Sequence, residues 1–191
     1  MKICVYCASS NKVAEKYFGV AEILGSQMAK EGHTLVYGGG SMGLMGRIAD
    51  VMLANGGHVR GVMPRFMDQV EWSHKRISEM VLVEDMHERK KLLVEGVDAV
   101  VALPGGCGTL EELSEVITLK RLGKFTKPII ILNLDGFYDP LQLLLDRMVE
   151  ERFMRPEHQR MYTFVERAED IIPAIKSAPV WDVDAIAFAA V

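Results

Sequence analysis

The sequence predicts an α/β fold in which helices cover both faces of a doubly wound parallel sheet. Short apolar runs alternate with helical patterns along the chain, which indicates repeated β-α-β units with right-handed crossovers. Residues 100–103 and 129–132 are apolar without alternation, as in strands that are covered on both faces. At roughly 150 residues per domain, the 191 residues suit one domain, so we expect a single Rossmann-like domain over residues 1–191.

Seven segments have the short apolar or β-branched pattern of strands, and the last of them is the weakest. The first segment ends at polar residues and lacks the length and cleavage site of a signal peptide, so a strand fits it better. The predicted strands are residues 3–8, 34–37, 59–63, 80–83, 99–103, 129–133 and 163–165.

Six further segments repeat apolar residues at the spacing of an amphipathic helix. Gly32 and Gly56 follow the first two of them, where glycines commonly end helices. The predicted helices are residues 14–31, 44–54, 86–95, 110–122, 140–151 and 168–176.

Composition narrows the class of protein. The 49% hydrophobic and 25% charged residues are typical of a folded globular protein and exclude a disordered chain. A net charge of −4 without a basic run argues against a nucleic-acid partner. No segment approaches the roughly 18 apolar residues of a membrane span, so we expect no membrane partner either.

Three cysteines, Cys4, Cys7 and Cys107, are too few for a disulfide framework, which favours a reducing cytoplasm. Cys4 and Cys7 form C-x-x-C, but no second pair completes a zinc site. Side chains three apart on a strand point to opposite faces, so we expect two buried thiols. The five histidines show no metal-ligand spacing, and no metal is expected.

Small and hydroxyl residues follow three of the predicted strands. Ligands of a doubly wound sheet bind beyond the carboxyl ends of its strands, so we expect these residues to line one crevice. They are Ser9-Ser10, Gly38-Gly39-Gly40-Ser41 and Pro104-Gly105-Gly106.

The first glycine loop, Gly38-x-Gly40-x-x-Gly43, formally matches the dinucleotide-binding fingerprint. Such glycines let a backbone approach a phosphate at a helix N-terminus. The match follows the second strand rather than the first, and Arg60 and Arg65 lie where a ribose-binding carboxylate is expected. We therefore expect phosphate binding rather than NAD, with tight packing of a turn as the alternative.

The second glycine loop covers residues 104–112. Its glycines offer backbone N–H groups, Thr109 a hydroxyl and the following helix a positive dipole end, which together predict an anion site. Glu112 lies within the apolar side of that helix, where a carboxylate needs a partner or a chemical role. The alternative is a capping box, in which Glu112 only bonds the backbone amide of Thr109.

Arg89 falls between Leu92 and Leu93 on the helical wheel, and Lys90 also lies among apolar residues. Positive charge near a helix N-terminus is unfavourable, so anion recognition or a buried ion pair must offset it. The alternative is an ordinary surface pair between Asp85 and Arg89.

Two of these features together resemble the signature of the LOG (Lonely Guy) family. Members are cytokinin riboside 5′-monophosphate phosphoribohydrolases, and some were mislabelled as lysine decarboxylases. The resemblance extends through nearly the whole chain, and one departure is Cys107, where the family usually carries Tyr or Phe. The signature consists of Arg89-Lys90 and Pro104-Gly105-Gly106-x-Gly108-Thr109-x-x-Glu112.

The resemblance implies hydrolysis of the N-glycosidic bond of a nucleoside 5′-monophosphate, with Arg89 and Glu112 as the catalytic pair. It also implies at least a dimer, with sites completed across the subunit interface, and no metal or redox cofactor is required. The residues expected to contact substrate are Glu71, Lys90, Gly105, Gly106, Cys107, Gly108, Thr109, Leu110, Glu111, Thr118, Ser9, Gly39, Gly40 and Ser41.

Cleavage of a glycosidic bond builds positive charge on the ribose. Glu112 would stabilise that charge and orient or deprotonate the attacking water, while phosphate held by the glycine loops would position the sugar. Arg89 would anchor the substrate and hold Glu112 ionised, or would assist the departing base.

Two other classes of function stay open at this point. One is an NAD(P)-dependent oxidoreductase built on residues 38–43. The other is a non-catalytic nucleotide sensor in which Arg89 and Glu112 form only an ion pair. A pyridoxal-phosphate decarboxylase is disfavoured, because no lysine stands out as a Schiff-base candidate.

Overall fold

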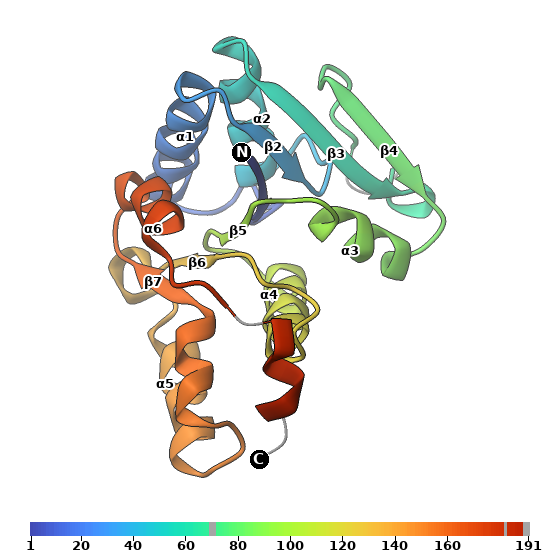
Figure 1. The fold of residues 1–191 in the computed structure, drawn as a ribbon. Helices are drawn as coiled ribbons and strands as arrows, with labels where there is room; N and C mark the ends of the chain where they lie inside the picture. Colours follow the sequence, from blue (N-terminus) through green and yellow to red (C-terminus); the bar gives the residue numbers. More distant parts are fainter. Residues whose placement is uncertain (69–71, 182, 189–191) are drawn as a thin grey trace.

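The computed structural model describes residues 1–68, 72–181 and 183–188, which build one seven-stranded, fully parallel sheet (Figure 1). The strand order is β4-β3-β2-β1-β5-β6-β7, so the predicted fold class is confirmed. The chain returns from β4 at one edge to β5 beside β1, which creates the switch point where such sheets bind ligands. The strands are β1 (Lys2–Tyr6), β2 (Thr34–Tyr37), β3 (His58–Pro64), β4 (Glu79–Val83), β5 (Ala99–Ala102), β6 (Ile129–Leu132) and β7 (Thr163–Val165).

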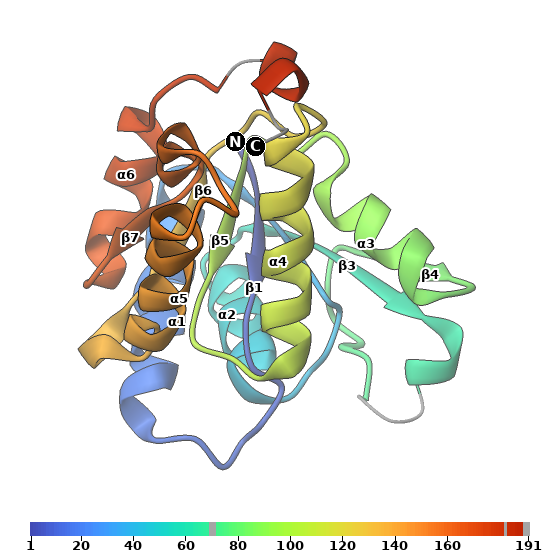
Figure 2. The same cartoon turned by 90° about the horizontal axis from the view of Figure 1, so that it is seen from below.

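Helices cover both faces of this sheet, as the view from below shows (Figure 2). Ile3 and Val5 of β1 pack with α1, α2 and α6, while Cys4 and Tyr6 pack on the opposite face with α3 and α4. This alternation follows from the two-residue period of a strand. The helices are α1 (Glu15–Lys30), α2 (Gly43–Ala54), α3 (Met86–Val94), α4 (Cys107–Arg121), α5 (Asp139–Glu150) and α6 (Ile171–Ser177).

Short 3-10 helices complete the described part of the chain. The predicted helix over residues 168–176 begins as one of them and becomes α-helical at Ile171, close to Pro173, which a first helical turn tolerates. These segments are η1 (Arg65–Met67), η2 (Leu134–Gly136), η3 (Pro156–Met161), η4 (Ala168–Asp170) and η5 (Val183–Phe188).

The cysteines behave as expected from their spacing. Cys4 and Cys7 are buried free thiols in different apolar clusters, one on each face of the sheet. Burial raises the pKa of both thiols, so they stay neutral. Cys107 is also free but exposed.

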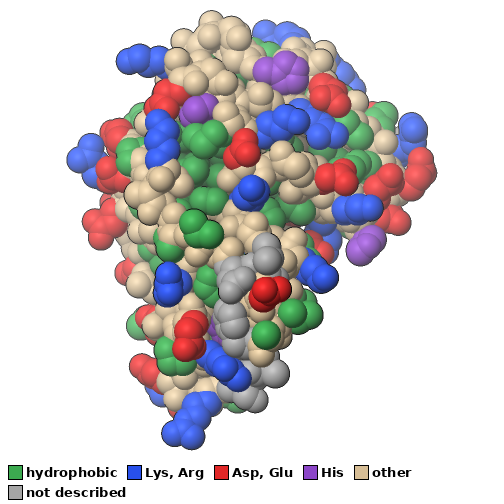
Figure 3. Space-filling view, viewed as in Figure 1, with side chains coloured by type: hydrophobic (Ala, Val, Ile, Leu, Met, Phe, Trp, Pro, Cys, Tyr) green, Lys and Arg blue, Asp and Glu red, His purple; other side chains and the backbone are tan. Residues whose placement is uncertain are grey.

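The surface carries both signs of charge. On the face seen in Figure 3, Lys and Arg side chains are interspersed with Asp and Glu rather than gathered in one patch. None of the helices within the described ranges combines the length and apolar character needed to cross a membrane.

Candidate active site

A cavity of about 240 Å³ opens where β1, β2 and β5 end, as the residues following those strands predict. Its wall combines the exit of β1, the start of the first glycine loop, one side chain of α3 and the beginning of α4. The lining residues are Val5, Tyr6, Cys7, Ala8, Ser9, Gly38, Met45, Arg89, Gly106, Cys107, Gly108, Thr109 and Glu112.

Helix α4 begins at Cys107, earlier than the predicted start at residue 110, with Gly106 as its N-cap. The glycines on either side of Cys107 are poor helix formers, which is why the sequence indicated a longer loop. The first hydrogen bond within the helix runs from the Leu110 N–H to the Gly106 carbonyl, at 3.1 Å. The N–H groups of the three residues before Leu110 precede this bond, and those residues line the cavity. The predicted anion site is therefore a helix N-terminus.

This start of α4 makes the capping-box interpretation of Glu112 wrong. Thr109 is the third residue inside the helix rather than its N-cap, and Gly106 has no side chain to cap with. Thr109 instead folds back on Gly105, where an added Cβ would lie 2.1 Å from the Thr109 hydroxyl oxygen. Glu112 therefore does not complete a capping box with Thr109, and it lines the cavity.

Arg89 and Glu112 form a buried ion pair on the cavity wall. Arg89 Nη1 lies 3.2 Å from Glu112 Oε1, and the two side chains are 8% and 10% exposed. Arg89 Nε also donates to the Val62 carbonyl at 3.2 Å, and Nη2 donates to the Gly38 carbonyl at 3.4 Å. The guanidinium is therefore held from three sides, which fixes the carboxylate opposite it.

The Asp85–Arg89 surface pair is wrong. Asp85 is the N-cap of α3, and its carboxylate accepts the Glu88 N–H at 2.8 Å. Arg89 is buried because the apolar side of α3 packs on the sheet, as its place between two leucines indicated.

Glu112 affects the pKa of a buried thiol that also lines the cavity. Burial, followed by the charge of Glu112, raises the pKa of the Cys7 thiol. A neutral Cys7 does not compete as a nucleophile in the cavity. The charged side chains among the residues that line the cavity are those of Arg89 and Glu112.

The first glycine loop is bound mostly by protein. Residues Gly39 to Ser41 meet a later loop: His74 donates its N–H to the Gly39 carbonyl at 2.9 Å, and Ser41 donates its N–H to the Trp72 carbonyl at 3.2 Å. Gly40 pairs with Ser73 in an antiparallel bridge. Gly39, Gly40 and Ser41 thus lie beside the cavity without lining it, which favours the tight-packing alternative for this loop.

Three further residues that were expected to contact substrate do not line this cavity: Lys90 on α3, and Glu111 and Thr118 on α4. Lys90 Nζ is 2.5 Å from Glu111 Oε1 and 3.3 Å from Glu115 Oε2, and the hydrogen bond to Glu111 raises the pKa of Lys90. Thr118 donates its hydroxyl to the Ser114 carbonyl at 2.9 Å. Glu71 lies outside the described residues.

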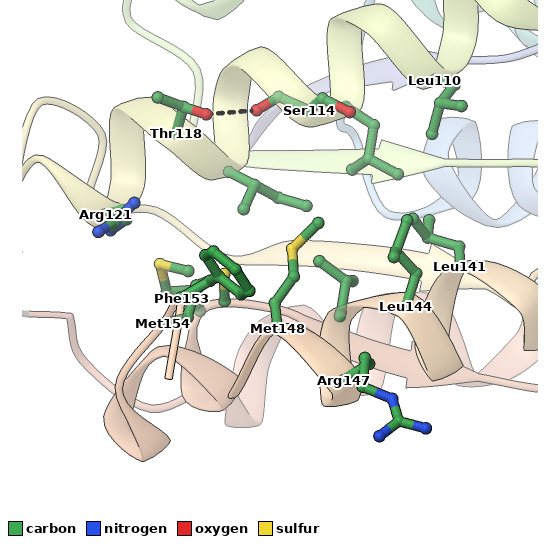
Figure 4. A pocket seen from close by; sticks show the side chains of 14 residues that line it. Leu110, Ser114, Thr118, Arg121, Leu141, Leu144, Arg147, Met148, Phe153 and Met154 are labelled. Atoms are coloured by element: carbon green, nitrogen blue, oxygen red, sulfur yellow. Dashed lines mark hydrogen bonds between the residues drawn. The ribbon is translucent and has the colours of Figure 1, made fainter. Parts of the chain in front are cut away.

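Leu110 and Thr118 line a separate apolar groove of about 720 Å³ between α4 and α5 (Figure 4). Leu144 and Phe153 on the opposite wall are 52% and 72% exposed. The wall formed by α5 and Phe153 was not predicted from the sequence. The sequence does contain a signal for this wall, the run Leu141-Gln142-Leu143-Leu144-Leu145. Its leucines cover more of the helix circumference than one buried face requires.

The family of this chain follows from comparison with known proteins. A family model described as possible lysine decarboxylase matches residues 45–175. The rice cytokinin riboside 5′-monophosphate phosphoribohydrolase LOG is 40% identical over 188 residues, covering 95% of this chain and 78% of the rice protein. The chain belongs to the LOG family. Arabidopsis thaliana LOG7, a phosphoribohydrolase of the same description, is 39% identical and covers 98% of this chain and 91% of its own.

Solved structures share the fold of this LOG-family chain. The Moco carrier protein of Chlamydomonas reinhardtii has a TM-score of 0.70 at 21% identity, over 93% of this chain and 96% of that protein. The molybdenum cofactor binding protein of Rippkaea orientalis has a TM-score of 0.71 at 22% identity, over 92% and 95%. At this level of identity the likeness concerns the fold alone.

Proposed function

We propose that this chain hydrolyses the N-glycosidic bond of nucleoside 5′-monophosphates, with cytokinin riboside 5′-monophosphate, AMP or both as substrates. Water adds to the anomeric carbon, and the products are the free base and ribose 5-phosphate. The observation that carries the proposal is the buried Arg89–Glu112 pair on the wall of a cavity that the N-terminus of α4 borders. The LOG-family relatives that bear this activity in their names support it.

The phosphate is proposed to bind at the start of α4. The N–H groups of Cys107, Gly108 and Thr109 precede the first intrahelical bond, and the helix dipole adds positive potential there. Binding energy from the phosphate positions the ribose, which does not react at that end.

Glu112 then faces the anomeric carbon. Its carboxylate stabilises the positive charge that develops on the ribose and orients or deprotonates the attacking water. Arg89 holds this carboxylate ionised and in place. Like the sequence-based mechanism, this chemistry requires no metal or redox cofactor.

A homodimer is part of the proposal, because the α4–α5 groove is apolar and adjoins the site. Leu110 belongs to the first turns of α4 and also lines the groove, so a second copy seated there lies close to the phosphate site. Lys90, Thr118 and Glu71 remain proposed substrate contacts, completed by this interface. The single domain over residues 1–191 and a reducing cytoplasm complete the proposal, and the free thiols Cys4 and Cys7 support that location.

The two alternative classes differ in their support. Gly38 and Gly43 approach Arg89 and the backbone of Ser9, respectively, so these glycines make room for protein rather than for a dinucleotide. This observation disfavours the oxidoreductase. The nucleotide sensor uses the same cavity and differs only in turnover.

The decisive experiment incubates the protein with AMP and with N6-isopentenyladenosine monophosphate and measures free base and ribose 5-phosphate. We expect release from at least one nucleotide, and a fall in kcat of about 10³-fold or more in Glu112→Gln, because the neutral amide no longer stabilises the developing charge. Glu15→Gln, an exposed carboxylate at the start of α1, is the matched control. Binding without release in the wild type would instead establish a sensor.

A further inference from the structure

The first glycine loop needs support from other parts of the chain to keep its shape. Its three consecutive glycines, Gly38 to Gly40, have no side chains to pack, and glycine has more backbone freedom than any other residue. Gly38 nevertheless offers its carbonyl to Arg89 Nη2 at 3.4 Å, so the position of this loop affects the position of the guanidinium. Contacts from outside the loop must therefore keep it ordered.

Residues 72–76, which we call the covering loop, supply those contacts. The covering loop bonds to the backbone of Gly39 and Ser41 and pairs with Gly40 in an antiparallel bridge. The Ser41 hydroxyl also donates to the Trp72 carbonyl, at 2.5 Å. These bonds hold the glycine loop only as firmly as the covering loop is itself held.

The His74 side chain fixes the covering loop to helix α2. The residue is 5% exposed, its Nε2 lies 3.2 Å from Asp50 Oδ1, and its Nδ1 lies 3.3 Å from the Arg76 backbone nitrogen. An amide N–H can only donate, so Nδ1 accepts, and Nε2 carries the proton that it donates to Asp50. Arg76 Nη2 donates to the same carboxylate oxygen at 2.6 Å. Asp50 thus binds two side chains of the covering loop.

We propose that His74 is a positioning residue for the Arg89–Glu112 pair, acting through the Asp50 carboxylate and the first glycine loop. The inference rests on the proposed function, because it concerns the geometry of the same site. His74 does not line the candidate active site, so its effect passes through the backbone that ends at the Gly38 carbonyl. Because Arg89 Nη1 lies 3.2 Å from Glu112 Oε1, a shift of that carbonyl reaches the carboxylate through one side chain.

The first test replaces His74 by Phe, which keeps a ring in the buried space and removes both hydrogen bonds. We expect kcat for the better nucleotide substrate to fall about tenfold, with KM changed less than about twofold, because the carboxylate is displaced while the N-terminus of α4 is not. His74→Gln keeps a donor for Asp50 and is expected to regain most of the turnover. The matched control is His33→Phe, the same change at a buried histidine just before β2, at the end of the sheet opposite the site.

Two further measurements separate positioning from a general loss of structure. In an Arg89→Lys background, His74→Phe is expected to change kcat less than about twofold, since the guanidinium that it positions is already absent. By NMR, the Arg89 Nε–H proton is assigned by its loss in Arg89→Lys. We expect this proton to exchange with water about tenfold faster in His74→Phe than in the wild type, because the guanidinium is held less firmly.

The outcomes distinguish this inference from the proposed function. If the wild type has no turnover but His74→Phe still speeds the exchange of the Arg89 proton, the hydrolase fails and the positioning role stands. An unchanged kcat and an unchanged Arg89 exchange rate in His74→Phe would overturn the inference. An equal loss of kcat with and without Arg89→Lys would also overturn it, because His74 would then support the fold in general.

Discussion

Gly38 shows how one missing side chain shapes the site. Its carbonyl accepts a hydrogen bond from Arg89, and a Cβ added at this position would lie 2.3 Å from Arg89 Nη2. An alanine at this position would therefore force the end of the Arg89 side chain to move away from its place beside Glu112. The residue that appeared to belong to a dinucleotide fingerprint instead makes room for the Arg89 side chain.

Gly38→Ala is therefore expected to lower kcat about 100-fold, because the displaced guanidinium no longer holds Glu112 in position. Steady-state kinetics with the better nucleotide substrate checks this. Gly19→Ala is the control, since an added Cβ there meets nothing within 4 Å and alanine favours the α1 helix by about 1 kcal/mol. Wild-type turnover in Gly38→Ala would show that Arg89 does not set the geometry of the carboxylate.

Periodicity at the residue scale predicted that two buried charges need partners, and the structure pairs them with each other. Arg89 and Glu112 each lie on an apolar side of a helix, where an unpaired charge is too costly to bury, so each sequence position already required a partner. Their pairing with each other, and the contribution of the Val62 carbonyl, depend on how α3 and α4 pack on the sheet. No local pattern contains that information.

Different sides of helix α4 face three different environments. Thr109 and Glu112 face the cavity, Leu110 and Thr118 face the groove, and Lys120 is buried near the C-terminal end of the helix. A helix covered on several sides has a weak amphipathic pattern. The sequence indicated the apolar side that contains Glu112, while the late predicted start of the helix comes from the glycines beside Cys107.

Lys120 makes the stability of the folded chain depend on pH. The side chain is 2% exposed, donates to the Lys127 carbonyl at 2.8 Å and lies near the Trp181 ring. Burial lowers the pKa of Lys120 from 10.5 to about 8. Between these two values the unfolded chain binds more protons than the folded one, so this group makes stability rise with pH across that window.

We expect Lys120→Met to raise the free energy of unfolding at pH 7 by about 1–2 kcal/mol and to flatten its rise between pH 8 and 10. A buried charged lysine costs on the order of 3 kcal/mol by its lowered pKa, and loss of the bond to the Lys127 carbonyl offsets part of the gain. Urea unfolding at several pH values measures this, with exposed Lys124→Met as the control. An unchanged pH slope in Lys120→Met would contradict the prediction.

At the scale of the whole molecule, the groove between α4 and α5 is the surface that the isolated chain leaves incomplete (Figure 4). Exposed Leu144 and Phe153 border it, and such a continuous apolar surface is typical of an interface. Residues of α4 line both this groove and the candidate active site. A second copy covering the groove would therefore place the candidate active sites of the two copies close to each other.

Leu144→Glu combined with Phe153→Glu is expected to shift a dimer to monomer, because four charges would then enter an apolar two-fold interface. Light scattering after size-exclusion chromatography measures the mass. We also expect kcat/KM to fall at least tenfold if the partner completes the site. The matched control is Val180→Glu, an exposed position outside the groove. A wild type that is monomeric at micromolar concentration would rule out the interface.

The sequence by itself determined the α/β class, the positions of the strands, the two buried thiols and the two charged residues that needed partners. These features follow from local periodicity, which depends only on residues close together in the sequence. Only the tertiary structure decided that Arg89 meets Glu112 and that residues 72–74 cover Gly39 to Ser41. Those contacts join segments far apart in the chain, and their geometry is set by the strand order and by the packing of helices across the sheet.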